Sequence, residues 1–207
     1  MTCSVSKYRL GVLISGSGSN LQAIIDATKK DTLPEAEVVV VVSSKKSAYG
    51  LKRAKDEGID SIYLPYKEFG ISETYDRRIV EVLKSYKVDL VVLAGYLKIL
   101  GSPLLEAFED KILNIHPSLL PDFGGVNMYG IKVHEAVLAA KRSYSGCSVH
   151  IVTEEVDKGP IIDQISVPVK PDDTPEELAR RVLSCEHQLY PRAIKKYIQK
   201  LKMEQSV

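Results

Sequence analysis

The sequence predicts an α/β fold, in which a mostly parallel, twisted sheet carries helices on both faces and ends in an antiparallel extension. Short, continuous runs of apolar, β-branched residues alternate with segments of helical periodicity, without an intervening linker or low-complexity segment. Strands that lack polar alternation are buried on both faces, as in parallel sheets covered by their connecting helices. Two further strand-like runs follow late in the chain, close enough together to form the antiparallel extension.

The parallel part of the sheet accounts for the first 116 residues. Its strands are predicted at 8–14, 37–42, 61–64, 88–94 and 111–116. Leu21, Ile24 and Ile25 repeat at helical spacing after the first strand, and further helices are expected at 48–57 and 74–86. This alternation is Rossmann-like, so the carboxyl ends of the strands are the expected place for a binding site.

The last third of the chain contains the extension and a long helix. Strands are predicted at 148–153 and 161–169. A capping box formed by Thr174 and Glu177 begins the helix, whose buried stripe consists of Leu178, Val182, Cys185 and Leu189. Pro191 is expected to kink or end this helix and to leave a basic, solvent-exposed helix as the tail.

Composition limits the classes of protein without naming a function. A chain of 207 residues predicts one domain over 1–207, since domains average about 150 residues. The formal net charge of +1 lacks the basic excess typical of nucleic-acid-binding proteins, and the apolar runs are far shorter than a membrane span. We therefore expect neither a nucleic acid nor a membrane as a partner.

The cysteines indicate a reducing compartment. Cys3, Cys147 and Cys185 are far apart, odd in number and without CxxC spacing, which excludes a disulfide framework or a zinc ribbon. No signal peptide is visible at the start of the chain. The expected localisation is cytoplasmic, and no metal site is expected.

A glycine-rich loop, SGSGSNL, joins the first strand to the first helix. Gly16 and Gly18 permit a tight turn, and Ser19 or Asn20 can cap the helix. Free backbone N–H groups and the positive end of the helix dipole suit a phosphate at this point. We therefore favour phosphate binding over a plain turn.

A dinucleotide-binding loop is the main alternative for this segment. Leu21 occupies the position of the third glycine of the G-x-G-x-x-G fingerprint. The second strand ends in the run 43–46, Ser-Ser-Lys-Lys, where a ribose-binding carboxylate would be required. The NAD-type interpretation is therefore disfavoured.

The segment KILNIHPSLLP places two polar side chains at the end of a buried strand. Asn114 and His116 project to one face, whereas Leu113 and Ile115 project to the other. An amide and an imidazole together provide an oxyanion donor and a proton donor, as acyl transfer requires. A hydrogen-bonded core histidine remains an equal alternative for His116.

Two carboxylates and two further histidines have weaker signals. Asp157, which precedes Gly-Pro, is most simply a turn residue, and Glu186 at the edge of the helical stripe is expected to reach solvent. His150 faces either the core or the same cleft as His116. The segment HEAVL that begins at His134 lacks the second histidine of a zinc motif.

Taken together, six segments between positions 11 and 191 resemble the phosphoribosylglycinamide formyltransferase family. They are LISGSGSNLQAII, SSKKSAYGLKRA, VVLAGYLKIL, ILNIHPSLLPDFGG, SVHIVTEEVDKGPII and CEHQLYP. NIHPSLLP is shared with other folate-dependent formyl and hydroxymethyl enzymes, so SGSGSNLQAI is the discriminating part. The resemblance implies transfer of a formyl group from N10-formyltetrahydrofolate to the primary amine of glycinamide ribonucleotide, without a metal.

The resemblance also assigns catalytic roles. His116 is expected to be the general acid, Asn114 to bind the formyl group and the oxyanion, and Asp157 to raise the pKa of His116 and relay protons. This agrees with the chemistry, because a carboxylate near an imidazole favours the imidazolium.

The substrate-binding assignments follow from the same resemblance. The phosphate is expected at Gly18, Ser19 and Asn20, and the ribose hydroxyls at Glu186. Folate is expected to contact Asn114 and two loops, made of Leu97, Lys98, Ile99 and Leu100 and of Thr153, Glu154, Glu155 and Val156. The second loop is expected to close over the pterin. The first half of the single domain thus binds the ribonucleotide, and the second half binds folate and carries catalysis.

Three departures from the family pattern are present. Lys98 stands where many relatives have arginine and lacks its planar bidentate contact. Ser72 stands where some relatives have a folate-contacting arginine, so that contact is expected to be absent. The segment 123–132 is longer than the common form, so a different loop path is expected.

Other functions remain as alternatives. A methionyl-tRNA formyltransferase normally has an extra carboxyl-terminal domain, and a formyltetrahydrofolate hydrolase an amino-terminal one, and the length of the chain leads us to expect neither. A catalytically silent nucleotide-binding module would not need Asn114, His116 and Asp157. Small-molecule substrates are the expected partners, and the oligomeric state, monomer or homodimer, stays open.

Overall fold

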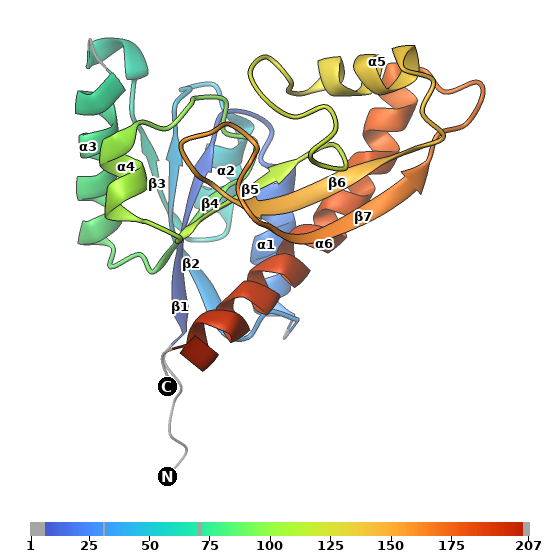
Figure 1. The fold of residues 1–207 in the computed structure, drawn as a ribbon. Helices are drawn as coiled ribbons and strands as arrows, with labels where there is room; N and C mark the ends of the chain where they lie inside the picture. The colour runs from blue at the N-terminus through green and yellow to red at the C-terminus, as the bar shows by residue number, and fades with distance from the viewer. Residues whose placement is uncertain (1–6, 31, 70–71, 205–207) are drawn as a thin grey trace.

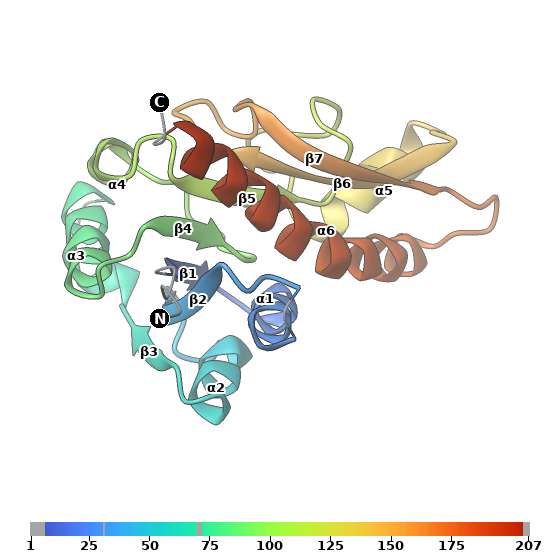
Figure 2. The same ribbon diagram turned by 90° about the horizontal axis from the view of Figure 1, so that it is seen from below.

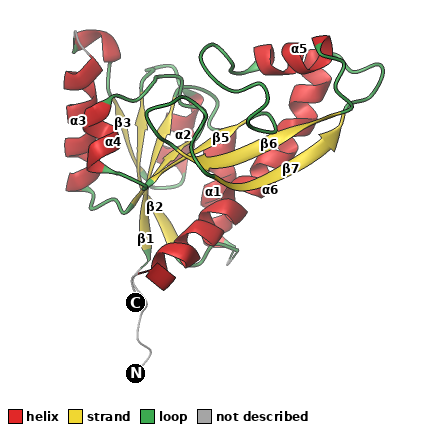
Figure 3. Ribbon diagram, viewed as in Figure 1, coloured by secondary structure: helices red, strands yellow, loops and turns green. Residues whose placement is uncertain are grey.

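The computed structural model describes residues 7–30, 32–69 and 72–204. A seven-stranded sheet in the order β3-β2-β1-β4-β5-β6-β7 runs through the molecule (Figures 1 and 3). Strands β1 to β5 are mutually parallel, and β6 and β7 continue the sheet antiparallel. The strands are β1 Tyr8–Ile14, β2 Ala36–Ser43, β3 Asp60–Tyr63, β4 Leu90–Leu93, β5 Ile112–His116, β6 Tyr144–Ile151 and β7 Ile161–Pro168. The predicted fold class is confirmed.

Helices cover both faces of the sheet (Figure 2). They are α1 Ser19–Lys29, α2 Tyr49–Asp56, α3 Ser72–Ser85, α4 Ser102–Ala107, α5 Ile131–Ala139 and α6 Pro175–Glu204, with a short 3-10 turn η1 at Tyr66–Glu68. Residues of α1, α2, α5 and α6 share one hydrophobic cluster with the sheet, and residues of α3 and α4 share the other. The sheet therefore separates two cores.

Alternation along β5 sets the direction of the polar side chains. Leu113 and Ile115 belong to the core under α6, whereas Ile112 belongs to the core under α3 and α4. Because side chains alternate along a strand, Asn114 and His116 lie on the same face as Ile112. The sequence predicted this arrangement.

The tail of the chain differs from the prediction. Helix α6 continues through Pro191 to Glu204, and its second half is not a solvent-exposed helix. Pro191 is buried, as are the apolar residues that follow it at helical spacing, Ala193, Ile194, Tyr197 and Ile198. These residues pack into the core under the sheet, and this burial outweighs the loss of one helical hydrogen bond at the proline.

Helix α6 also joins the two parts of the sheet. The hydroxyl group of Tyr190 lies 2.9 Å from the carbonyl oxygen of Leu93 in β4 and 3.0 Å from that of Leu113 in β5.

Helices α4 and α5 were not predicted from the sequence. No helix within the described ranges is long and apolar enough to cross a membrane.

Candidate active site

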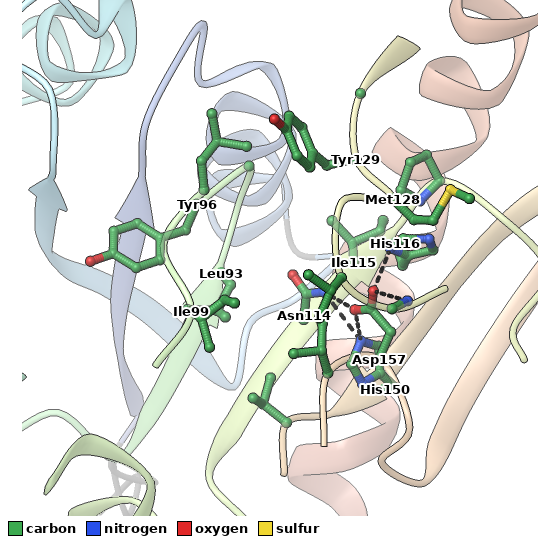
Figure 4. A pocket seen from close by; sticks show the side chains of 18 of the residues that line it. Leu93, Tyr96, Ile99, Asn114, Ile115, His116, Met128, Tyr129, His150 and Asp157 are labelled. Carbon is green, nitrogen blue, oxygen red and sulfur yellow. Dashed lines mark hydrogen bonds and ion pairs between the residues drawn. The ribbon is translucent and has the colours of Figure 1, made fainter. Parts of the chain in front are cut away.

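A cavity of about 700 Å³ opens at the carboxyl ends of the central strands. Segments far apart in the sequence contribute lining residues, namely the start of α1, parts of 93–100, 114–117, 125–131 and 150–157, His134 of α5, and one face of α6. Figure 4 shows Asn114, His116, His150 and Asp157 grouped on one side, with Tyr96 and Ile99 across from them. Such a position is where open α/β sheets bind ligands.

His116, the last residue of β5, contacts an acceptor through each ring nitrogen. Its Nδ1 lies 3.3 Å from Oδ2 of Asp157, and its Nε2 lies 2.8 Å from the carbonyl oxygen of Phe123. The two side chains of the ion pair are only 5% and 9% exposed. Because both partners are acceptors, the imidazolium satisfies both contacts at once.

The direction of the His116 pKa differs from the expectation. Burial lowers the pKa of His116 below its ordinary value, and Asp157 and the Phe123 carbonyl only partly oppose that effect. Asp157 does raise the pKa of His116, as expected, but desolvation outweighs it.

Asp157 occupies a turn, and its side chain points into this cluster. Its backbone has a positive φ of 58°, in the left-handed region that is unusual for a residue with a side chain. Oδ2 accepts a hydrogen bond of 3.0 Å from the backbone N–H of Gly125, and Oδ1 lies 3.5 Å from Nε2 of His150. Burial alone would raise the pKa of Asp157, but His150, His116 and the Gly125 N–H outweigh it and lower that pKa. The interpretation as a turn residue alone is wrong.

Asn114 and His150 complete the cluster across a strand pair. The two residues are opposite each other in the β5–β6 register, and Asn114 Nδ2 lies 3.1 Å from His150 Nε2. His150 Nδ1 lies 2.9 Å from the carbonyl oxygen of Ile151, and its Nε2 contacts both Asn114 Nδ2 and Asp157 Oδ1. His150 faces the cleft. Strand parity and pairing would have identified it, had the start of β6 been predicted correctly.

The glycine loop differs from the prediction in the residue that caps α1. The N-cap of α1 is Gly18, with φ of 69°, and no side chain caps the helix, so the capping role expected for Ser19 or Asn20 is wrong. A Cβ at Gly18 would lie 2.6 Å from Cα of Gly50, and Gly50 N–H donates to the carbonyl of Gly16 at 3.2 Å. The loop is therefore held against α2, and the first N–H groups of α1 have no partner within the helix.

Asn20 turns instead toward α6. Its Nδ2 donates a 2.7 Å hydrogen bond to Oε2 of Glu186, and both side chains are buried. Asn20 Oδ1 is buried and has no hydrogen-bond partner among the described residues. Burial raises the pKa of Glu186, and Asn20 partly opposes this. The expectation that Glu186 reaches solvent is wrong.

The cavity contains most, but not all, of the residues assigned to substrates. Leu97, Lys98, Ile99, Leu100, Thr153, Glu154, Val156, Asn20 and Glu186 line it. Within the described residues, Gly18, Ser19 and Glu155 are not among the lining residues. Glu155 instead pairs with Lys158 at 2.7 Å on the surface.

Several lining residues were not singled out for the cavity from the sequence. The longer segment 123–132 contributes Met128 and Tyr129 to the cavity wall (Figure 4). His134 in α5 also lines the cavity, and its buried Nδ1 has no hydrogen-bond partner among the described residues. Burial, together with the nearby His116, lowers the pKa of His134 to about 4. No group of three or more His, Cys, Asp or Glu residues within the described ranges is placed to hold a metal ion.

Known proteins similar to this chain include phosphoribosylglycinamide formyltransferases. A curated relative, the chloroplastic phosphoribosylglycinamide formyltransferase of Vigna unguiculata, is 45% identical over 187 residues, which are 90% of this chain and 60% of that protein. The phosphoribosylglycinamide formyltransferase of Haemophilus influenzae is 44% identical over 187 residues, covering 90% of this chain and 85% of that protein.

Other relatives are much longer than this chain. The trifunctional purine biosynthetic protein adenosine-3 of Gallus gallus is 46% identical over 189 residues, and the match spans 91% of this chain but only 18% of that protein. Among solved structures, glycinamide ribonucleotide transformylase 1 of Symbiobacterium toebii is 45% identical with a TM-score of 0.87, covering 91% of this chain and 86% of that one. The family model described as formyl transferase matches residues 8–194. On this match and these relatives, the chain belongs to the formyl transferase family.

Proposed function

We propose that this chain is a phosphoribosylglycinamide formyltransferase. It transfers the formyl group of N10-formyltetrahydrofolate to the primary amine of glycinamide ribonucleotide, giving formylglycinamide ribonucleotide and tetrahydrofolate in de novo purine (IMP) biosynthesis. One observation carries the proposal: a single cavity joins the His116–Asp157 pair to the glycine loop region at Asn20. A ribonucleotide amine and a formyl donor need such a joint site.

The reaction requires an oxyanion donor and a proton donor. The amine nitrogen attacks the formyl carbon, a C–N bond forms, and the carbonyl oxygen becomes an oxyanion. Asn114 is the proposed donor to that oxygen, since its 3.5 Å contact with Asp157 is the longer of its two amide contacts and the easier to exchange. The intermediate then collapses as the bond to N10 breaks.

His116 is the proposed donor of the proton that N10 gains as it leaves. The proton on Nε2 faces the carbonyl oxygen of Phe123 at 2.8 Å, so its delivery requires this backbone group to release the ring. Asp157 at Nδ1 keeps the ring oriented and favours its charged form. The amine loses its own proton during the transfer, and Asp157 is the proposed relay.

The substrates occupy opposite ends of the cavity in this proposal. Gly18, Ser19 and Asn20 bind the phosphate, and Glu186 binds the ribose hydroxyls. Supporting the phosphate assignment, the first N–H groups of α1, which have no acceptor within the helix, lie beside a left-handed glycine at its N-cap. Glu186 is already held by Asn20, so a diol would meet a fixed carboxyl group.

Folate is assigned to the wider part of the cavity. The exposed apolar side chains of Leu97 and Ile99 offer a surface for the pterin and benzoyl groups. The Nζ atom of Lys98 lies 3.9 Å from the centre of the Tyr66 ring, so a folate group that contacts this cation must lie near that ring. Asn114 and the 153–156 loop, with Thr153, Glu154, Glu155 and Val156, complete the assignment.

The remaining features of the proposal concern the whole chain. Residues 1–207 form one domain, with the ribonucleotide bound mainly by its first half and folate and catalysis served by its second. The partners are small molecules. The protein acts as a monomer or a homodimer in the cytoplasm. The free thiols of Cys147 and Cys185 suit that compartment.

A two-substrate assay tests the function. Purified protein supplied with glycinamide ribonucleotide and N10-formyltetrahydrofolate is expected to release tetrahydrofolate and formylglycinamide ribonucleotide in equal amounts. Omitting the ribonucleotide is expected to abolish release. Release that persists without it would contradict the proposal and indicate a hydrolase, and no release with both substrates present would also contradict it.

A further inference from the structure

The loop at residues 95–101, which forms the wall of the cavity opposite His116, is held almost entirely by side chains. It joins β4 to α4, and its side chains alternate in direction: Tyr96 and Leu100 are buried, whereas Leu97 is 51% and Ile99 61% exposed. Within the described part of the chain, no backbone-to-backbone hydrogen bond reaches residues 96–100. The shape of this loop therefore depends on other contacts.

The first end of the loop is fixed by a buried hydroxyl group. Ser15 Oγ accepts a 3.0 Å hydrogen bond from the backbone N–H of Leu97 and lies 2.8 Å from Oγ of Ser44. The backbone N–H of Ser15 also donates to the carbonyl oxygen of Gly95 at 3.1 Å. Both serine side chains are buried, so no water replaces them readily.

The second end is fixed by a buried carboxylate. Asp76 in α3 is 2% exposed, and its Oδ2 accepts a 2.6 Å hydrogen bond from the backbone N–H of Gly101. A Cβ at Gly101 would lie 2.8 Å from that same oxygen, so a side chain at this position would force the Asp76 carboxylate to shift. A buried carboxylate is costly unless it has a specific partner, and the partner here is the loop itself.

We propose that Ser15 and Asp76 are positioning residues for folate. Neither touches the cosubstrate; each fixes one end of the 95–101 loop and so determines where Leu97 and Ile99 meet it. This inference rests on the proposed function. It also places Ser15 at a junction, since Ser15 is the first residue of the glycine loop assigned to the phosphate.

Ser15→Ala and Asp76→Ala test the proposal by two independent measurements. Each variant leaves a partly buried backbone N–H, that of Leu97 or that of Gly101, without its acceptor, a loss that corresponds to a change of about tenfold in an equilibrium constant. We expect faster hydrogen–deuterium exchange at 95–101 and a KM for N10-formyltetrahydrofolate raised by about tenfold. The KM for glycinamide ribonucleotide is expected to change by less than about twofold in Asp76→Ala, because the contact removed lies at the folate end of the loop.

Three variants serve as controls. Asp76→Asn keeps an acceptor for Gly101 N–H and is expected to restore the folate KM to within about threefold of the parent value. Asp173→Ala removes another buried carboxylate, one that pairs with Arg181, and Ser85→Ala removes a hydroxyl group on α3 that bonds to the carbonyl of Val82. Both are expected to leave the folate KM unchanged.

The outcomes separate this inference from the proposed function. Unchanged exchange at 95–101 in both alanine variants would overturn the positioning role. Faster exchange with an unchanged folate KM would overturn it as well. If the parent protein shows no formyl transfer, the proposed function fails, while the exchange measurement still reports whether the two anchors hold the loop.

Discussion

The two ends of the cavity each contain a buried carboxylate, and the pKa values of the two carboxylates are shifted in opposite directions. Glu186, at the end assigned to the ribonucleotide, has a single neutral amide as its partner, and burial raises its pKa. Asp157, at the end assigned to chemistry, faces two histidines and a backbone N–H, which together lower its pKa. The different neighbours of the two buried carboxylates therefore shift their pKa values in opposite directions.

The difference follows from the local fold. Asp157 lies in a turn beside the antiparallel strands, where β5 and β6 bring His116 and His150 to the same place. Glu186 lies on α6 against the first turn of α1, where the side chain of Asn20 is its recorded hydrogen-bond partner. The parallel half thus provides binding by backbone and amide groups, whereas the antiparallel extension brings the titratable groups together.

Removing the acid at the chemistry end is expected to have the largest effect. His116→Gln keeps a polar side chain but has no proton to donate at neutral pH, so turnover is expected to fall by 10²–10⁴-fold, the usual contribution of a general acid. Substrate KM values should change little. Steady-state kinetics measure both, and turnover within threefold of the parent would remove His116 from its assigned role.

Neutralising Asp157 is expected to have the next largest effect. Asp157→Asn removes the charge that raises the pKa of His116, so turnover should fall by roughly 10²-fold. A general acid is active below its pKa, and the loss of activity with rising pH should therefore begin at lower pH in the variant. A pH–rate profile tests this, with Asp173→Asn as the control. An unmoved inflection would contradict the coupling.

His134 shows what burial does when no counter-charge opposes it. Its pKa of about 4 lies below the ordinary 6.5, so the folded state binds its proton less readily than the unfolded state. The contribution of His134 to the free energy of unfolding is complete above pH 6.5 and is lost as the pH falls toward 4. By pH 4.5 the loss is on the order of 2 kcal/mol. Urea unfolding at pH 7.5 and 4.5 should show a smaller loss in His134→Gln. An equal loss in both proteins would exclude this titration.

The smallest expected effect is a difference of sign between the two carboxylates. At pH 8, Glu186→Gln removes a charge that burial disfavours and should raise the free energy of unfolding. Asp157→Asn removes a charge that its neighbours favour and should lower that free energy. Chemical denaturation of both variants measures the difference. Changes of the same sign in the free energy of unfolding of the two variants would contradict the opposite pKa shifts of Glu186 and Asp157.

The sequence predicted the sheet and the direction of its polar residues because strand parity is local information. Asn114 and His116 follow from alternation within one strand. Local pattern alone makes Asp157 a turn residue, because its partners His116, His150 and Gly125 come from other segments of the chain, and only the family resemblance assigned it to the catalytic trio. The net direction of the His116 pKa differs for a similar reason, since the burial that lowers it depends on how distant segments pack around the ring.

Helix ends and helix packing were the least predictable features. The sequence rule for N-caps favoured Ser19 or Asn20, but the close approach of Gly18 and Gly50 determines the actual cap. Pro191 signalled an end to α6 because the rule treats the helix in isolation. Residues 193–198 continue the apolar stripe, and this pattern, visible in the sequence, would have shown that the tail packs on the core.

Helix α6 has a consequence for how the molecule comes apart. It carries Glu186, contacts α1, α5 and strands on both sides of β5, and bonds through Tyr190 to β4 and β5 (Figure 1). We therefore expect the structure around both ends of the cavity to unfold together with α6. We expect a single calorimetric transition, with the van't Hoff enthalpy equal to the measured one. Two fragments divided at the 170–174 loop should assemble a working cavity only when mixed.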